Sequence, residues 1–286
     1  MKVTPVKHHI IPCVALAYEG RQPSNVPKGA QLVTLYTMDK VVTALSWLNS
    51  KQYLHSNGSL AVGTAHAYDI PFEFMGASVI LDQFEIQPSG SALNYIEEDA
   101  CPIPGEVVAV RTLITRIENI HLRRFINTAL SKPLVFYRFW TSPVTIKINT
   151  DFGTLAGYSR ETAEEAINAL CDQPSWQALA AAYGLLNYYG YIWCHEEDEY
   201  GQVPDDLAPD KVRYEMLLPA LAELIKACPE TGKVMDSLLS GRWRNDGNKI
   251  SHRIGLVVQD IRADHAKIIK ATAPRGHYGW QPEFVK

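Results

Sequence analysis

A histidine pair near the start of the chain is the first feature whose chemistry would suit catalysis. His8 and His9 stand in the stretch VKHHIIPC, residues 6–13. Imidazole is a common metal ligand and the usual general base at neutral pH, so two in succession raise a metal or proton-transfer hypothesis. The side chains that follow them decide between that hypothesis and a structural role.

This stretch resembles the opening of the metal motif of HNH nucleases. The resemblance implies a base histidine, then an asparagine that holds it, and then a second histidine that binds the metal. Asn25 follows His9 at a tolerable distance, but the next histidine is His55, and Asp39 is the one acidic side chain between Asn25 and His55. The motif is incomplete at the metal, so we predict a strand that places His8 and His9 on opposite faces.

Two other clusters contain reactive groups without the geometry of a site. The run WCHEEDE, residues 193–199, offers His195 and Glu199 to a metal at helical i, i+4 spacing, but such runs are more often exposed acidic helix ends. Ser251 and His252 are adjacent, and adjacent residues of a helix do not face each other. Neither cluster predicts a catalytic centre.

The cysteines and the short motifs also argue against an enzyme. The five cysteines form no C-x-x-C pair, so we expect no structural zinc, and free thiols suggest a reducing compartment. The usual hydrolase, phosphate-loop and dinucleotide motifs are absent from the sequence. We therefore expect no metal and no cofactor, and favour binding over catalysis. A catalytic site assembled from distant residues stays open as the alternative.

Charge is distributed unevenly along a chain whose net charge is −4. Residues 111–147 contain seven Lys or Arg against one Glu, and residues 242–275 contain eight against three Asp. Residues 196–230 lie between these blocks and contain ten acids against three basic residues. Such alternation suits a polyanion-binding surface combined with a surface for self-association, and ordinary solvated surface is the alternative.

Both basic blocks mix arginine with aromatic residues. Guanidinium groups follow phosphates, and aromatic rings stack on unpaired bases, so the mixture suits single-stranded nucleic acid. In the alternative interpretation the aromatic residues belong to the core and the arginines pair with the acidic region 196–230. The predicted nucleic-acid-binding residues are Arg111, Arg116, Arg123, Arg124, Arg138, Trp140, Arg242, Trp243, Arg244 and Lys249.

The first part of the chain has the pattern of strands and turns. Short runs of β-branched and apolar residues, separated by prolines and glycines, predict strands. Between them, MDKVVTALSWLNS (38–50) has helical spacing, with Asp39 as its N-cap. The predicted strands lie at 13–18, 32–36, 60–70, 78–87 and 106–114.

The chain beyond this part is predicted to be mainly helical, with one alternating strand at 143–150. The first helix should end before Pro133, and the last has the most regular apolar stripe. The predicted helices lie at 116–131, 160–171, 174–194, 211–228 and 248–271, with a short helix bracketed by Gly232 and Gly241. We expect an α+β protein with a β-rich region at 1–115, a mainly helical region at 116–271 and an extended tail at 272–286.

One charge-free stretch, residues 173–194, is long enough to span a bilayer. It contains Pro174, Asn187 and four tyrosines and has no basic flank, so we predict a buried core helix and no membrane contact. The first residues lack the apolar run of a signal peptide. We expect an intracellular, cytoplasmic protein, and a place in a virion is compatible with the same features.

The predicted tail contains three large aromatic residues, Tyr278, Trp280 and Phe284, among prolines and glycines. That composition does not form a regular helix, so a folded surface must cover the rings. We predict that the tail docks on another subunit and forms a homo-oligomer. Folding back on its own domain is the alternative.

Together these features predict a self-associating protein of the coat or nucleoprotein type that binds single-stranded nucleic acid, with RNA as the expected strand. Local basic blocks on a mildly acidic chain allow repeated subunits to bind a polyanion without strong mutual repulsion. Two alternatives stay open. One is a hydrolase, with or without a metal, whose site is assembled from distant residues. The other is a subunit of a protein complex that binds no nucleic acid.

Overall fold

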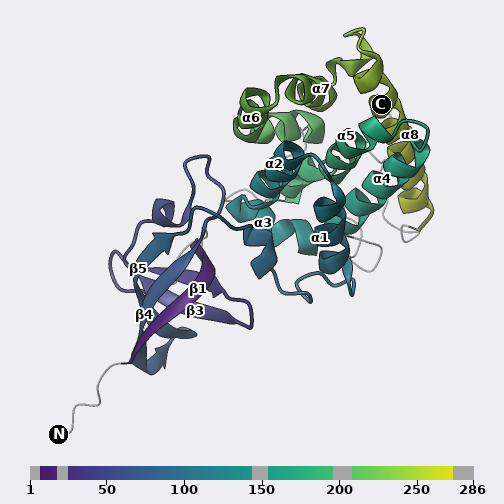
Figure 1. The fold of residues 1–286 in the computed structure, drawn as a ribbon. Helices are drawn as coiled ribbons and strands as arrows, with labels where there is room; N and C mark the ends of the chain where they lie inside the picture. Colours follow the sequence, from purple (N-terminus) through teal and green to yellow (C-terminus); the bar gives the residue numbers. More distant parts are fainter. Residues whose placement is uncertain (1–6, 18–24, 144–153, 196–207, 273–286) are drawn as a thin grey trace, which may run out of the picture. The chain divides into compact units, whose positions relative to one another are not determined.

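The computed structural model describes residues 7–17, 25–143, 154–195 and 208–272. The chain divides into two compact units, which are described separately here. The barrel unit comprises Met1–Glu97 with Ser131–Pro133, and the helical unit comprises Glu98–Leu130 with Leu134–Lys286. All five strands belong to the first and all eight labelled α-helices to the second, which confirms the predicted α+β class for the described residues (Figure 1).

The barrel unit is a closed five-stranded barrel with the order β1-β2-β3-β5-β4. Strands β3 and β5 are parallel, and the other neighbouring pairs are antiparallel. A five-stranded Greek-key barrel in this order has the topology of the OB-fold. The strands are β1 (His8–Ala17), β2 (Gln31–Tyr36), β3 (Val41–Ser46), β4 (Val62–Phe74) and β5 (Ala77–Ile86).

Alternation along the strands decides which side chains fill the barrel. On β2, Val33 and Leu35 are fully buried in the barrel core. Thr34 and Tyr36, which alternate with them along the strand, are only partly buried. Position 63 of β4 is a glycine for a steric reason. A Cβ there would lie 2.6 Å from the carbonyl oxygen of Glu85 on β5. This close approach of β4 to β5 leaves no space for a side chain.

The predicted helix at 38–50 is wrong, because this segment contains strand β3. Residues 37–40 form the turn of a β2–β3 hairpin, in which the Thr37 hydroxyl donates to the carbonyl of Lys40. Asp39 lies in this turn and caps no helix. The segment VVT starts β3 with three β-branched residues, and pairing with β2 and β5 outweighs the helical spacing of the apolar residues after them.

The predicted strand at 106–114 is also wrong, because these residues form helix α1 (Glu106–Arg116). Its apolar run is compatible with a buried strand and with a helix, and periodicity alone does not separate the two. Val107, Val110 and Leu113 are buried at helical spacing. Glu106 accepts hydrogen bonds from Arg160 of α4, which holds the start of α1 in place.

The sequence pattern also did not predict helix α3 of the helical unit. Helix α2 ends at Leu130, and Pro133 begins α3 instead of merely terminating the preceding helix. Proline is favoured in the first turn of a helix, where its missing N–H has no intrahelical partner to lose. The helices after α1 are α2 (Ile120–Leu130), α3 (Pro133–Thr141), α4 (Leu155–Ala169), α5 (Pro174–Leu185), α6 (Pro209–Ala227), α7 (Pro229–Ser240) and α8 (Lys249–Thr272).

Helix α5 and the 3-10 turn η4 (Tyr189–His195) occupy the stretch that was predicted as one buried helix. Tyr188, just before η4, and Tyr189, the first residue of η4, are fully buried. The Tyr189 hydroxyl donates to the carbonyl of Ala129 on α2 at 3.0 Å. No helix in the described part of the chain has both the length and the apolar character needed to cross a membrane.

Two predictions lie outside the described residues. The predicted strand at 143–150 overlaps them only at Pro143, which forms an isolated bridge with Thr154. The predicted oligomerisation residues of the tail, Tyr278, Trp280 and Phe284, fall within 273–286 and also lie outside.

Candidate nucleic-acid interface

All ten residues predicted to bind nucleic acid belong to the helical unit. Arg111 and Arg116 lie on α1, and Arg123 and Arg124 lie on α2. Arg138 and Trp140 lie on α3, the 3-10 turn η5 (Arg242–Arg244) holds three of the remainder, and Lys249 begins α8. The barrel unit contributes none of them.

The two predicted tryptophans are buried and so cannot stack on bases. Trp140 is 1% exposed and Trp243 is 3% exposed. The phenylalanines of the first block, Phe125, Phe136 and Phe139, are buried too, and Tyr137 is its one exposed aromatic ring. The structure removes Trp140 and Trp243 from the predicted set, because their rings fill the helical core. The aromatic residues follow the alternative interpretation of the basic blocks.

The predicted arginines are spread over several sites. Arg116, Arg124 and Arg244 line three different cavities of the helical unit. Arg242 forms an ion pair with Asp236 of α7. Arg244 lies over the ring of Trp243, with its Cζ 4.5 Å from the ring centroid. Arg116, Arg124 and Arg244 therefore do not share one cavity among the described residues.

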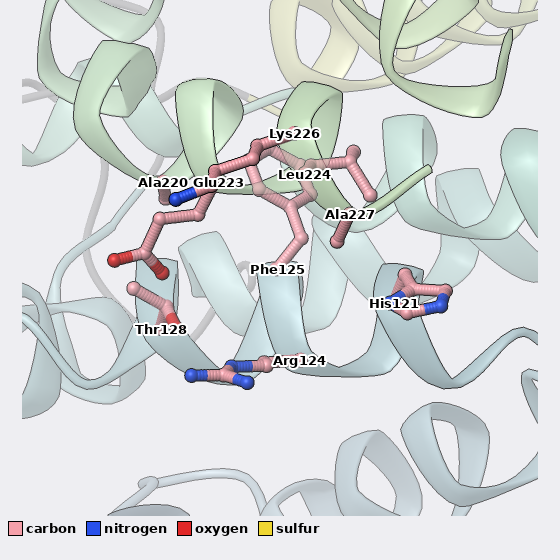
Figure 2. Close-up of a pocket in the computed structure, with 9 residues that line it drawn as sticks. All are labelled: His121, Arg124, Phe125, Thr128, Ala220, Glu223, Leu224, Lys226 and Ala227. Carbon is pink, nitrogen blue, oxygen red and sulfur yellow. The ribbon is translucent and has the colours of Figure 1, made fainter. Parts of the chain in front are cut away.

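Arg124 belongs to a cavity of about 430 Å³ between α2 and α6. Figure 2 shows the apolar side chains of Phe125 and Leu224 between the two helices, with Arg124 and Glu223 beside them. His121 and Lys226 complete the titratable groups of its lining. The cavity mixes an acid with cations and gives no clear preference for one charge.

The outer face of strands β2 and β3 in the barrel unit was not predicted as a site. Thr34 pairs with Thr43 and Tyr36 pairs with Val41, and these four side chains alternate with the residues of the barrel core. Trp47 directly follows β3, is 52% exposed, and has its Cδ1 3.9 Å from where a Cβ would stand on Gly29. The outer face of β2 and β3 therefore continues at one end into an exposed tryptophan, which lies beside the β1–β2 loop.

Charge differs between the two sides of the barrel. Lys28, Lys40 and Lys51 are exposed in the segments that flank β2 and β3. Residues 62–86, which contain β4 and β5, have no Lys or Arg, and their acids include Asp69, Asp82 and Glu85. With Asp39 of the β2–β3 turn counted, the segments that flank β2 and β3 still carry more positive charge than β4 and β5, which suits an anion better.

The histidine pair starts β1, as predicted, and its partners are structural. Nε2 of His9 lies 2.7 Å from a carboxylate oxygen of Asp69 on β4. The His8 ring lies 5.5 Å from that of His66 and 4.9 Å from that of Tyr68, measured between centroids. The described residues contain no group of three potential metal ligands, and Glu199 of the WCHEEDE cluster lies outside them.

Other polar residues missed by the sequence interpretation lie in the helical core. Arg213 of α6 is 3% exposed and donates to Oδ1 of Asn187, which is 2% exposed. One signal was present in the sequence, because Arg213 shares the helix face of Leu217 and Ala220, which are buried. An arginine on an apolar stripe indicates a buried polar site.

The chain matches no protein-family model, and no curated protein sequence is significantly similar to it.

Proposed function

We propose that this chain binds single-stranded nucleic acid, RNA in the first instance, on the outer face of strands β2 and β3. The observation that supports the proposal most directly is the closed barrel with the order β1-β2-β3-β5-β4. In OB-fold proteins this face and the adjoining loops bind oligonucleotides. Because one fold serves many functions, the residues on the face must support the proposal independently.

Those residues have the two properties that single-strand binding needs. Trp47 offers an exposed ring for stacking, and base–aromatic stacking tolerates any sequence. Lys28, Lys40 and Lys51, exposed in the segments that flank β2 and β3, offer positive charge to the phosphates. The acids of β4 and β5 repel a strand from the other side of the barrel and so direct it to β2 and β3.

Self-association through the C-terminal tail is the second part of the proposal. A strand-binding barrel on a mildly acidic chain suits repeated subunits along one nucleic acid. The coat or nucleoprotein role needs both parts, because a single barrel contacts only about 4–16 nucleotides.

The test measures binding of fluorescently labelled oligo-uridine and oligo-thymidine by anisotropy at several salt concentrations. Trp47→Ala should weaken binding about tenfold, since loss of one stacked base costs on the order of 1–3 kcal/mol. Lys40→Gln should lower the log–log salt slope by about 0.7, the value for one lost phosphate contact on a single strand. Tyr68→Ala is the matched control, because this ring is 36% exposed on acidic strand β4.

Equal effects of Trp47→Ala and Tyr68→Ala would contradict the proposed face. A variant in which Arg123, Arg124, Arg242 and Arg244 are all replaced by Ala tests whether the basic blocks bind the nucleic acid. If that variant loses binding while Trp47→Ala does not, the strand binds to the helical unit. Absence of binding by the wild-type chain would leave the protein-complex alternative.

A further inference from the structure

A second cavity of the helical unit has an unusual concentration of cations. It has a volume of about 290 Å³ and lies among α5, α6, the end of α7, η5 and α8. Four cationic side chains line it, against one carboxylate. They are Lys211, Arg213, Arg244 and Arg262, and the carboxylate is that of Asp210.

Asp210 is shared between two of these arginines. Nη1 of Arg262 donates to both of its carboxylate oxygens, at 2.9 and 3.1 Å, and Nη2 of Arg213 lies 3.5 Å from one of them. Burial alone would raise the pKa of Asp210, but the charges of Arg213 and Arg262 outweigh it and lower the pKa. The carboxylate is therefore ionised, and one negative charge faces several positive ones.

The remaining cations have weak or no carboxylate partners among the described residues. Lys211 lies 3.9 Å from Glu215, an exposed pair in the same helix turn. Arg244 stacks on Trp243. With three guanidinium groups and one carboxylate, the lining keeps an excess of positive charge, and a concave site focuses that charge on a bound anion.

Two buried donors supply an independent observation. Nε of Arg213 and Nδ2 of Asn187 have no hydrogen-bond acceptor among the described residues, and both residues line the cavity. A buried donor without an acceptor costs about 1–3 kcal/mol, and more for a charged group. Both groups are donors, so this part of the lining favours a ligand with acceptor oxygens over one with donor groups.

Aromatic rings hold two of the guanidinium groups in place. Besides the stacking of Arg244 on Trp243, Cζ of Arg213 lies 5.4 Å from the centroid of the Tyr183 ring. Trp243 is itself fixed by α8, because a Cβ on Gly255 would lie 2.3 Å from its Cδ2. Nη1 of Arg213 donates to Asn187 and its Nη2 pairs with Asp210, so the fork of Arg244 is the one of the two that suits bidentate recognition of phosphate.

We propose that this cavity binds a phosphate monoester. Two guanidinium charges remain after the pairing of Asp210 with one of the three arginines, and a phosphate monoester carries about −1.5 to −2 charge at pH 7. A carboxylate would neutralise one of them, and a neutral ligand would leave the donors of Arg213 and Asn187 beside unbalanced charge. The cavity volume suits a small ligand, so the monoester belongs to a small metabolite such as a nucleoside monophosphate.

The test uses the full chain and isothermal titration calorimetry with inorganic phosphate, a nucleoside 5′-monophosphate and the matching nucleoside. Both phosphate compounds should bind, and the nucleoside should not. Arg244→Gln should raise the Kd for the monophosphate about tenfold, as expected for one lost hydrogen bond to a charged group. The exposed Arg244 side chain makes misfolding improbable, and thermal unfolding of the variant checks this.

Arg253→Gln is the matched control, because Arg253 is exposed on α8 and does not line the cavity. Lys211→Gln is a second variant at the rim and should also raise the Kd. A short oligonucleotide with and without a 5′-phosphate separates the two sources of a monoester. Preference for the free monophosphate supports a metabolite, and preference for the 5′-phosphorylated strand supports a strand end.

Failure of the folded wild-type chain to bind either phosphate compound would overturn the proposal. Equal effects of Arg244→Gln and Arg253→Gln would also overturn it, because binding would then follow general charge. Failure of this proposal can be distinguished from failure of the barrel proposal, because Trp47→Ala should leave the Kd for the monophosphate unchanged.

Discussion

His265 on α8 is a titratable side chain enclosed by the helical core. It is 4% exposed, and its Nδ1 lies 3.1 Å from the hydroxyl of Tyr188. Burial lowers the pKa of His265 below its usual value of 6.5, against the opposing charges of Glu165 and Asp264. The folded protein therefore keeps this imidazole neutral at a pH where the unfolded chain takes up a proton.

The first prediction follows from this difference in proton uptake. The free energy of unfolding should fall as the pH decreases below about 6.5, by at most about 1.4 kcal/mol per pH unit from this group. His265→Gln should remove that part of the slope, measured by urea denaturation between pH 5 and 8. Tyr188→Phe should keep it, since burial and not the hydrogen bond causes the shift. An unchanged slope in His265→Gln would contradict this account.

Among the elements, α8 depends on one close contact with the turn before it. Gly255 packs against Trp243 with no space for a side chain, since a Cβ would lie within 2.6 Å of three ring atoms. Trp243 is buried under Arg244 and cannot move away without exposing core. The apolar stripe of α8 predicts the helix from the sequence, but it does not predict the contact between Gly255 and Trp243.

A second prediction tests that contact. Gly255→Ala should lower the free energy of unfolding by about 1–3 kcal/mol, because overpacking exceeds the gain of up to about 1 kcal/mol in helix propensity. Arg253→Ala, on the exposed side of α8, should change stability by no more than about 0.5 kcal/mol. Urea denaturation followed by circular dichroism measures both. A stabilised Gly255→Ala variant would show that α8 can shift relative to Trp243.

For the whole molecule, the two units assign the two proposed ligands to different parts of the chain. The barrel unit would bind the single-stranded nucleic acid, and the helical unit would bind the phosphate monoester. Binding of both ligands should be additive if the units act independently, and competition would indicate coupling. A titration of oligonucleotide in the presence of saturating monophosphate distinguishes the two cases.

Assembly is the third prediction, and it concerns the tail. A chain truncated after Ala271 should lose the large species in size-exclusion chromatography, because the aromatic anchors Tyr278, Trp280 and Phe284 are then missing. Its thermal transition should stay that of the full chain. A lower transition would assign the tail to its own domain, and unchanged assembly would exclude it from the subunit interface.

The sequence alone determined the fold class and most elements. Short runs of β-branched and apolar residues at 32–36 and 78–87 identified β2 and β5, and the stripe through Ile254, Val258 and Ile261 identified α8. These patterns are local, because the period of the backbone decides which side chains share a face. The net charge and its blocks are likewise read directly from the sequence.

Tertiary structure decided the rest, because burial and pairing depend on residues far apart in the chain. Segment 41–46 became a strand through pairing with β2 and β5, against its helical spacing. The arginine-rich sequence around Trp140 and Trp243 would look the same if the rings were on the surface, yet packing places both in the core. The cavity around Arg213 likewise joins five separate elements, so only the folded chain brings its charges together.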